Sequence, residues 1–311
     1  MKQPLISLLV SLVLCLPAAA APLSSSARTV VPSAIQQIIS VDYRALRDSP
    51  TARALQDRVL PENLKQFETA LKATGIDPDK DVDQITFITY RSAKGGVNAI
   101  GIAQGSFKQK EFLQKMRLKK IKPEKYQLAY LYPMGSGMHL VFLDPSTILF
   151  GESAAIKGAI DVRDNSAASL ESNSTVNDLV SSVDSSPVWS VLDQLGTQTM
   201  LRSALGDAAS LGDYDVVKKR LLASDYAMNF DSGVTFDLNV KTSDTMTAAT
   251  MATLVKAGVL YRKMNASATE KVALENTTVD NSHDMFTMHF KSDDQRFQAL
   301  LKSDLFAAVS H

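Results

Sequence analysis

A serine that follows a strand and opens a helix is the best candidate nucleophile in this chain. Gly151-Glu152-Ser153-Ala154-Ala155 comes directly after the β-branched and apolar run 147–150. A nucleophile elbow needs that position, and acids and His283 lie downstream in the chain order of a hydrolase triad. The motif ends in Ala rather than Gly, however, and the surrounding strands have an antiparallel pattern. The simpler interpretation is that Ser153 or Glu152 caps the helix or interacts with its dipole.

Histidines and acids offer no spacing that is typical of a metal site. The four histidines are His139, His283, His289 and His311. None of them lies in an H-x-x-H or H-E-x-x-H motif. Cys15 is the only cysteine, which excludes a disulfide within the chain and a site with several Cys ligands. The acids of DPDKDVD (77–83) resemble a calcium loop but lack the Gly and the distal Glu of an EF-hand, so we expect a helix cap there. We predict neither a metal nor a cofactor.

Tyrosines are the candidates for ligand binding. Tyr126, Tyr130 and Tyr132 form a one-sided row, and Tyr90 lies in a strand with apolar residues on both faces. Apolar residues on both faces indicate that both faces are covered. The cover is either protein, from a helix or the other domain, or an apolar ligand in a partly covered groove of the first domain. These four tyrosines are therefore the predicted ligand-binding residues.

The charge of the chain is balanced, but it is unevenly distributed. The 311 residues include 33 basic and 33 acidic side chains, and 45% are hydrophobic. This composition is ordinary for a globular protein and excludes a disordered tail, a collagen-like chain and a strongly basic nucleic-acid binder. Eight Lys and Arg residues gather in 108–125. That stripe suits anionic lipid or polymer, or else it is the solvated side of a helix. No aromatic residue is interleaved within the Lys-rich part, 115–125, which again argues against nucleic acid.

The N-terminus has the pattern of a secretory signal peptide. Residues 1–21 begin with Lys2, continue with an apolar run over 5–16 and end in small residues suited to cleavage. The alternatives are an uncleaved anchor and lipidation at Cys15, although Leu14 precedes that cysteine where a small residue is needed. We predict a periplasmic or secreted protein with no transmembrane span after cleavage.

The elements that must position these residues form two similar series. Each half has the order strand, helical segment, hairpin, helix, strands, helix, which suggests a distant internal duplication. We predict an α+β fold of two related domains, each an antiparallel sheet with helices packed on one face. The first domain spans 30–163, a Ser/Asn-rich connection with a short helix spans 164–186, and the second domain spans 187–309. In 226–241 apolar and polar residues alternate, so the second sheet should have one wet face.

Four stretches of the chain resemble a group of bacterial exported proteins of unknown function. They are 31–61 (VPSAIQQIISVDYRALRDSPTARALQDRVLP), 75–87 (GIDPDKDVDQITF), 142–161 (FLDPSTILFGESAAIKGAID) and 185–193 (SSPVWSVLD). The resemblance covers much of 31–193 and only loosely the rest. It implies an exported, two-part α+β protein and brings no activity and no catalytic residues. In that group the residue type at the position of Ser153 varies, which suits a cap better than a nucleophile.

We therefore expect an exported, non-enzymatic binding or interaction protein of the bacterial cell envelope, whose partner is a protein or an apolar ligand. One alternative is a carrier of an apolar ligand in the first domain. Another is a serine hydrolase that uses Ser153.

Overall fold

The structure is a computed structural model that describes residues 22–47, 49–59, 69, 71–92, 95–135, 137–206 and 214–303. The predicted signal peptide, with Cys15, lies outside these residues. Within them, we find no helix with the length and apolar character needed to cross a membrane.

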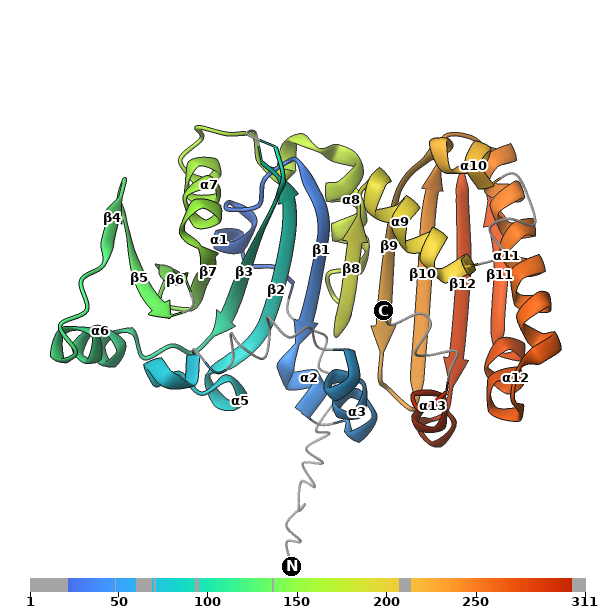
Figure 1. Cartoon of the computed structure of the whole chain (residues 1–311), viewed down its shortest axis with the longest axis horizontal. Coiled ribbons are helices and arrows are strands. Elements are labelled where there is room, and N and C mark those ends of the chain that lie inside the picture. The colour runs from blue at the N-terminus through green and yellow to red at the C-terminus, as the bar shows by residue number, and fades with distance from the viewer. Residues whose placement is uncertain are drawn as a thin grey trace, which may run out of the picture.

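One antiparallel sheet of twelve strands runs along the described part of the chain, from β11 at one end to β4 at the other (Figure 1). Its order is β11-β12-β10-β9-β8-β1-β2-β3-β7-β6-β5-β4. The strands are β1 (Ile35–Asp42), β2 (Val82–Arg91), β3 (Val97–Gly105), β4 (Glu124–Tyr126), β5 (Ala129–Gly135), β6 (Met138–Asp144), β7 (Thr147–Glu152), β8 (Val188–Leu192), β9 (Leu221–Asn229), β10 (Val234–Thr242), β11 (Thr277–Ser282) and β12 (Met285–Ser292). The predicted α+β class, built on antiparallel strands, is confirmed.

Helices connect these strands and cover the sheet. They are α1 (Ser25–Arg28), α2 (Tyr43–Arg47), α3 (Pro50–Val59), α5 (Pro78–Asp81), α6 (Gln109–Leu118), α7 (Ser153–Arg163), α8 (Ser174–Val183), α9 (Gln194–Leu205), α10 (Tyr214–Val217), α11 (Thr245–Asn265), α12 (Ala268–Glu275) and α13 (Asp294–Leu300). Short 3₁₀ turns lie at η1 (Leu170–Ser172) and η3 (Lys218–Arg220). The Ser/Asn-rich connection holds the expected helix, α8. Its N-cap is Asn173 rather than Ser174, because the Asn173 side chain accepts a hydrogen bond from the Val176 backbone.

The sheets predicted for the two halves join edge to edge through β1 and β8. These strands pair antiparallel over five residues of each strand. The only tryptophan, Trp189, lies opposite Ser40 at this seam and is fully buried. The Ser190 hydroxyl donates a hydrogen bond of 2.8 Å to the Ile38 carbonyl. The seam is therefore part of the hydrophobic core, and the domain boundaries expected at 163 and 187 stay a prediction.

The strand order repeats on the two sides of the seam. The series β1-β2-β3-β7-β6 in the first half corresponds to β8-β9-β10-β12-β11 in the second half. In the first half, β7 is the last of these strands in the chain, and it pairs with β3 of the hairpin β2–β3. In the second half, β12 likewise pairs with β10 of the hairpin β9–β10. A helix follows each of them, α7 after β7 and α13 after β12. The hairpin of β4 and β5 extends only the first half. The repeated order of elements matches the order that the sequence suggested.

The two faces of the sheet are named here by the helices that cover them. The row Ile88-Ile38-Val191-Asp225-Asn239 crosses five strands on the α7 face, which α1, α7 and α8 cover in the first half. The row Phe87-Ile39-Ser190-Tyr226-Leu238 crosses the same strands on the opposite, α11 face. On that face α6 covers the first half, and α9, α10, α11 and α13 cover the second.

Both faces of the first half are thus covered by protein, as its two-sided apolar strands indicated. In the second half, no described helix contributes to a core on the α7 face of β10, β12 and β11. That face is wet, as the alternation in 226–241 predicted. Its exposed members include Thr278, Asp280 and His289.

Candidate functional site

Ser153 is the first residue of α7 and faces the edge hairpin of the sheet. Its hydroxyl donates a hydrogen bond of 3.1 Å to Oε2 of Glu124 in β4. Glu152 occupies the N-cap position with an extended backbone, but neither it nor Ser153 caps the helix through its side chain. The expected capping interaction is therefore absent at this end of α7, and Ser153 instead links the helix to β4.

The geometry around Ser153 does not activate a nucleophile. Lys157, one turn along α7, donates a short hydrogen bond to Oε1 of Glu124. This contact, followed by the bond from Ser153, holds the pKa of Glu124 below its ordinary value despite some desolvation. A carboxylate with a lowered pKa is a poor general base. Ser153 therefore has an anionic partner that accepts its hydrogen bond without being suited to remove its proton.

The histidine expected to complete a triad lies far from Ser153. His283 is in the turn between β11 and β12, and six strands separate β12 from β7. At the usual spacing of strands, that separation is more than about 30 Å. His139 is nearer, since it pairs with Gly151 across β6 and β7. Its Nδ1 atom is buried without a hydrogen-bond partner in the described structure, and no hydrogen bond joins it to Ser153.

Tyr126 fastens the edge hairpin to α7. Its hydroxyl donates a hydrogen bond of 2.8 Å to Oδ1 of Asp161, and the Gln127 amide donates another of 2.8 Å to the same atom. The bond to the carboxylate raises the pKa of Tyr126, because the ionised phenol would lose it and face the Asp161 charge. Lys157 Nζ lies 5.5 Å from the centre of the Tyr126 ring, within the range of a cation–π interaction. Residues of α7 thus hold both Glu124 and Tyr126 of β4.

A tight turn breaks the predicted row of tyrosines. Tyr126 pairs with Ala129, so Gln127 and Leu128 alone form the loop, and Gln127 has a positive φ of 50°. A two-residue hairpin loop commonly uses positive φ, usually at Asn or Gly. The chain reverses there, which places Tyr126 on the α7 face with Ala129 and puts Tyr130 on the other face. Leu128 projects from the tip with 87% of its surface exposed.

The structure therefore separates the four predicted tyrosines into different environments. Tyr90 is buried under α7, where its hydroxyl donates a hydrogen bond of 2.8 Å to the Ala155 carbonyl. Tyr132 packs edge to face against Phe112 of α6, with 5.4 Å between ring centres. Tyr130 is 51% exposed. Tyr90 and Tyr126 both contact α7, but the four do not line one groove.

Two hollows lie elsewhere and are lined mainly by residues with polar side chains. One of about 350 Å³ is lined by Ser232, Asn276, Lys291, Ser292 and Asp293. The other, of about 380 Å³, is lined by Tyr43, Arg47, Arg53 and Asp79. Neither includes a predicted ligand-binding tyrosine.

The acidic loop 77–83 has structural roles in the described residues. Asp77 caps α5 by accepting a hydrogen bond of 3.2 Å from the Asp79 backbone, and Asp81 accepts one of 2.7 Å from the Asp77 backbone. Asp83 pairs with Arg44 at 3.4 Å. These contacts agree with the helix cap that the sequence favoured. No group of three or more His, Cys, Asp and Glu side chains in the described part of the chain could hold a metal ion.

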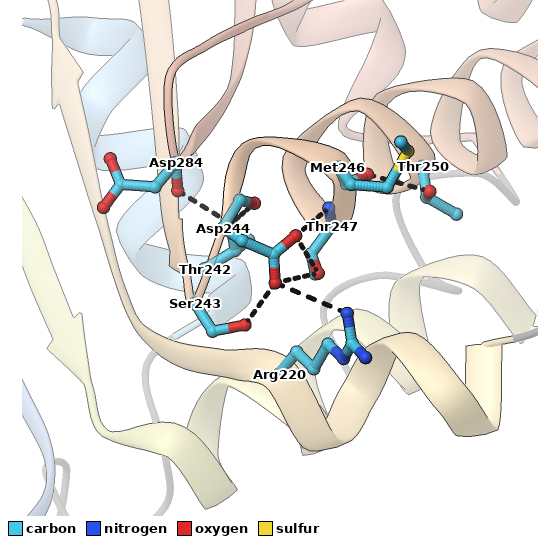
Figure 2. Close-up of polar contacts among 8 residues, drawn as sticks. All are labelled: Arg220, Thr242, Ser243, Asp244, Met246, Thr247, Thr250 and Asp284. Carbon is cyan, nitrogen blue, oxygen red and sulfur yellow. Dashed lines mark hydrogen bonds and ion pairs between the residues drawn. The ribbon is translucent and has the colours of Figure 1, made fainter.

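A second polar cluster surrounds the start of α11 (Figure 2). The Asp244 carboxylate accepts hydrogen bonds from the Ser243 hydroxyl at 2.7 Å and from the Thr247 backbone at 2.8 Å. These bonds, with Arg220 at 3.5 Å, hold the pKa of Asp244 at about 2. The Thr242 hydroxyl lies 2.8 Å from the Asp284 carbonyl, in the turn between β11 and β12. The Asp244 carboxylate is engaged by Ser243, Thr247 and Arg220, so it anchors the start of α11.

Three ionisable groups on the α7 face of the second half, a buried acid and an acid–histidine pair, are further candidates for chemistry. Asp225 is buried, and desolvation raises its pKa to about 6, although the Asn239 amide donates a hydrogen bond of 2.8 Å to it. Asp237 and His289 form a pair at 2.6 Å on the open surface of β10 and β12. Neither has a described nucleophile bonded to it, so an acid–base role has no partner there.

Comparison with models of protein families finds no match, and comparison with curated protein sequences finds none. Among solved structures, the chain is similar to crystal form III of a protein named TP0453, with a TM-score of 0.50 and 9% sequence identity, over 91% of this chain and 98% of that chain. Crystal form I of TP0453 aligns with a TM-score of 0.45 and 9% identity, over 91% of this chain and 97% of that chain. At this identity, the likeness to crystal form III is one of fold alone.

Sequence reasoning missed the contacts that join β4 to α7. Glu124 and Lys157 are 33 positions apart, and Tyr126 and Asp161 are 35 apart. The one available signal was local to α7, where Ser153, Lys157 and Asp161 recur every four residues and so lie on one helix face. That face meets the hairpin.

Proposed function

We propose that this chain is an exported, non-enzymatic binding protein of the bacterial cell envelope, and that the β4 end of its sheet is the binding surface. The β4 end means α6, the connection 119–123, β4 and β5, which lie together at one end of the long axis (Figure 1). The supporting observation is Leu128, the most exposed large apolar side chain among the described residues, on a turn fixed to α7. A side chain that is already held in place loses little conformational entropy when a partner covers it.

Export is supported by the signal-peptide pattern of residues 1–21. A mature chain without Cys15 would contain no thiol and would be indifferent to an oxidising compartment. Mass spectrometry of the protein from its own compartment tests this part. A mass that begins near residue 22 supports export with cleavage, whereas an intact N-terminus in the cytoplasmic fraction contradicts export.

The non-enzymatic part rests on the ion pair at Ser153. Because Lys157 already neutralises Glu124, the hydroxyl has no base to activate it. We expect no labelling of Ser153 by a fluorophosphonate probe, with a serine hydrolase as the positive control. Labelling that disappears in Ser153→Ala would overturn this part of the proposal and establish the hydrolase alternative.

The binding surface is tested by site-specific photo-crosslinking. A benzophenone amino acid is placed at Leu128 and, as a matched control, at Met246, which is 73% exposed on α11. In intact envelope preparations we expect a crosslinked product, protein or lipid, from position 128 and not from position 246. Equal products from both positions, or none from position 128, would contradict the proposed surface. A small molecule that copurifies and is lost on denaturation would instead favour the apolar-ligand carrier.

A further inference from the structure

The β4 end contains a dense run of basic residues. Residues 108–125 contain eight basic side chains against Glu111 and Glu124, in a chain whose formal net charge is zero. The eight are Lys108, Lys110, Lys115, Arg117, Lys119, Lys120, Lys122 and Lys125, and all are exposed. Of these, only Lys108 forms an ion pair with a described residue, Glu111, at 4.0 Å. Glu124 does not offset the others, because it pairs with Lys157.

Exposed apolar side chains accompany these charges. Leu118 at the end of α6 is 76% exposed and Leu128 at the hairpin tip is 87% exposed. α6 lies at the base of the β4–β5 hairpin and the turn lies at its tip, and both are at the same end of the long axis (Figure 1). Elsewhere in the described first half, the one exposed large apolar residue is Val97 of β3, at 59%, so the more exposed Leu118 and Leu128 lie at the β4 end with the charge.

The hairpin tip is rigid enough to insert as a unit. Tyr126 and Gln127 both donate hydrogen bonds of 2.8 Å to Asp161 of α7. The ion pair between Glu124 and Lys157 fastens the other end of β4. Leu128 therefore projects from a fixed turn rather than from a free loop.

Charge and apolar exposure together decide the kind of partner. A hydrophilic polyanion would attract the lysines but would leave Leu118 and Leu128 in water. An anionic lipid surface satisfies both groups, since lysines interact with headgroups and apolar side chains enter the boundary of the acyl region. Building on the proposed function, we infer that the β4 end docks on a bilayer containing anionic lipid, with Leu128 inserted and the lysines of 108–125 over the headgroups.

Vesicle cosedimentation of the mature chain, residues 22–311, tests this inference. We expect binding to vesicles of phosphatidylcholine with phosphatidylglycerol, little binding to phosphatidylcholine alone, and weaker binding at high salt. Leu128→Ser should weaken binding about tenfold, the loss expected from exposing one leucine. Met246→Ser, which removes an apolar residue that is 73% exposed on α11, should bind like the wild type.

A second pair of variants tests the charge. Lys119→Glu with Lys122→Glu should weaken binding at least about tenfold, because each lysine near an anionic surface contributes about 1 kcal/mol. Lys241→Glu with Lys291→Glu makes the same change in net charge on the open face of the second half and should have little effect. Equal losses from both pairs would overturn the assignment to the β4 end.

The outcomes separate this inference from the proposed function. If the wild type binds neither kind of vesicle while position 128 crosslinks to a protein, the lipid assignment is wrong and the binding surface stands. If position 128 neither crosslinks nor supports vesicle binding, both are wrong.

Discussion

The helices α7 and α13 follow corresponding strands of the two halves but pack on opposite faces of the sheet. Ala155, Ile156 and Ile160 of α7 pack on the face shared with α1 and α8. Phe297 and Leu300 of α13 pack on the other face, against Val234 and Phe290. The α7 face of the second half is consequently left open.

This difference explains why the strands of the two halves have different sequence patterns. Along one row of the α7 face, Ile88, Ile38 and Val191 give way to Asp225 and Asn239. The apolar residues end near the edge of the helical cover, since α8 reaches only as far as β8 and β9. A repeated strand order therefore does not require a repeated core. The position of one helix determines which residues each strand can carry.

The boundary between the covered and the open part of the α7 face lies near β9. The largest expected effect comes from placing a charge on each side of this boundary. Ala159→Glu puts a carboxylate beneath α7, where Ala159 has no exposed surface. Burial of an unpaired charge should lower the free energy of unfolding by about 4 kcal/mol or prevent folding. Thr287→Glu, on the open face of β12, should change it by less than about 0.5 kcal/mol. Urea denaturation followed by circular dichroism measures both. Comparable losses would mean that the open face is packed against something.

Asp225 lies at the boundary itself and should make stability depend on pH. Its pKa of about 6 in the folded state exceeds the ordinary value of 3.8, so the folded state binds more protons between these values. The free energy of unfolding should therefore fall as pH rises from about 4 to 6, and remain lower above that window. Asp225→Asn should remove this fall and stabilise the protein at pH 7.5 by up to about 3 kcal/mol.

The control for Asp225 is Asp237→Asn on the open side of the boundary. Asp237 is partly exposed and paired with His289, and desolvation raises the pKa of Asp225 more than the charge of Asp237 does. Its replacement should therefore keep most of the fall between pH 4 and 6. Denaturation at several pH values distinguishes the two variants. If Asp225→Asn keeps the wild-type dependence on pH, the carboxyl group is solvated and the boundary lies elsewhere.

The smallest effect is expected at the N-cap of α11, on the face that is covered in both halves. Asp244→Ala removes the acceptor for Ser243 and Thr247 and should lower Tm modestly (Figure 2). The pKa of Asp244 is about 2, below the ordinary value of 3.8. The stabilisation that its carboxylate provides is therefore present above pH 4 and is lost as pH falls through 2. Calorimetry at pH 7 and pH 2 should show a difference from the wild type only at pH 7.

Much of this comparison could be predicted from local pattern. The alternation in 226–241 correctly predicted one wet face, and the apolar residues at Leu140, Val141 and Phe142 correctly predicted two covered faces. Each of these signals lies within a single strand. The pairing of β1 with β8 left no such signal, since the paired residues are about 150 positions apart and neither strand has a pattern that identifies its partner.

The candidate site was less predictable because it depends on one unusual turn. Gln127 and Leu128 are not residues that normally form a two-residue hairpin loop. The sequence pattern therefore predicts one continuous strand with Tyr126, Tyr130 and Tyr132 on the same face. Once the chain reverses, Tyr126 meets Asp161 and Leu128 becomes the tip. The sequence alone identifies the basic segment and Ser153. That both lie next to β4 is apparent only in the folded chain.

The long open sheet also has two free edges, which in many proteins would recruit further strands and start fibre growth. Here the edges differ in how they avoid this. β4 has only three residues, two of them charged, and is fastened to α7 by its side chains. β11 is longer but exposes Asp280 and polar neighbours on one side. In the described structure, neither outer strand therefore presents an apolar template on which a strand of another molecule would pair.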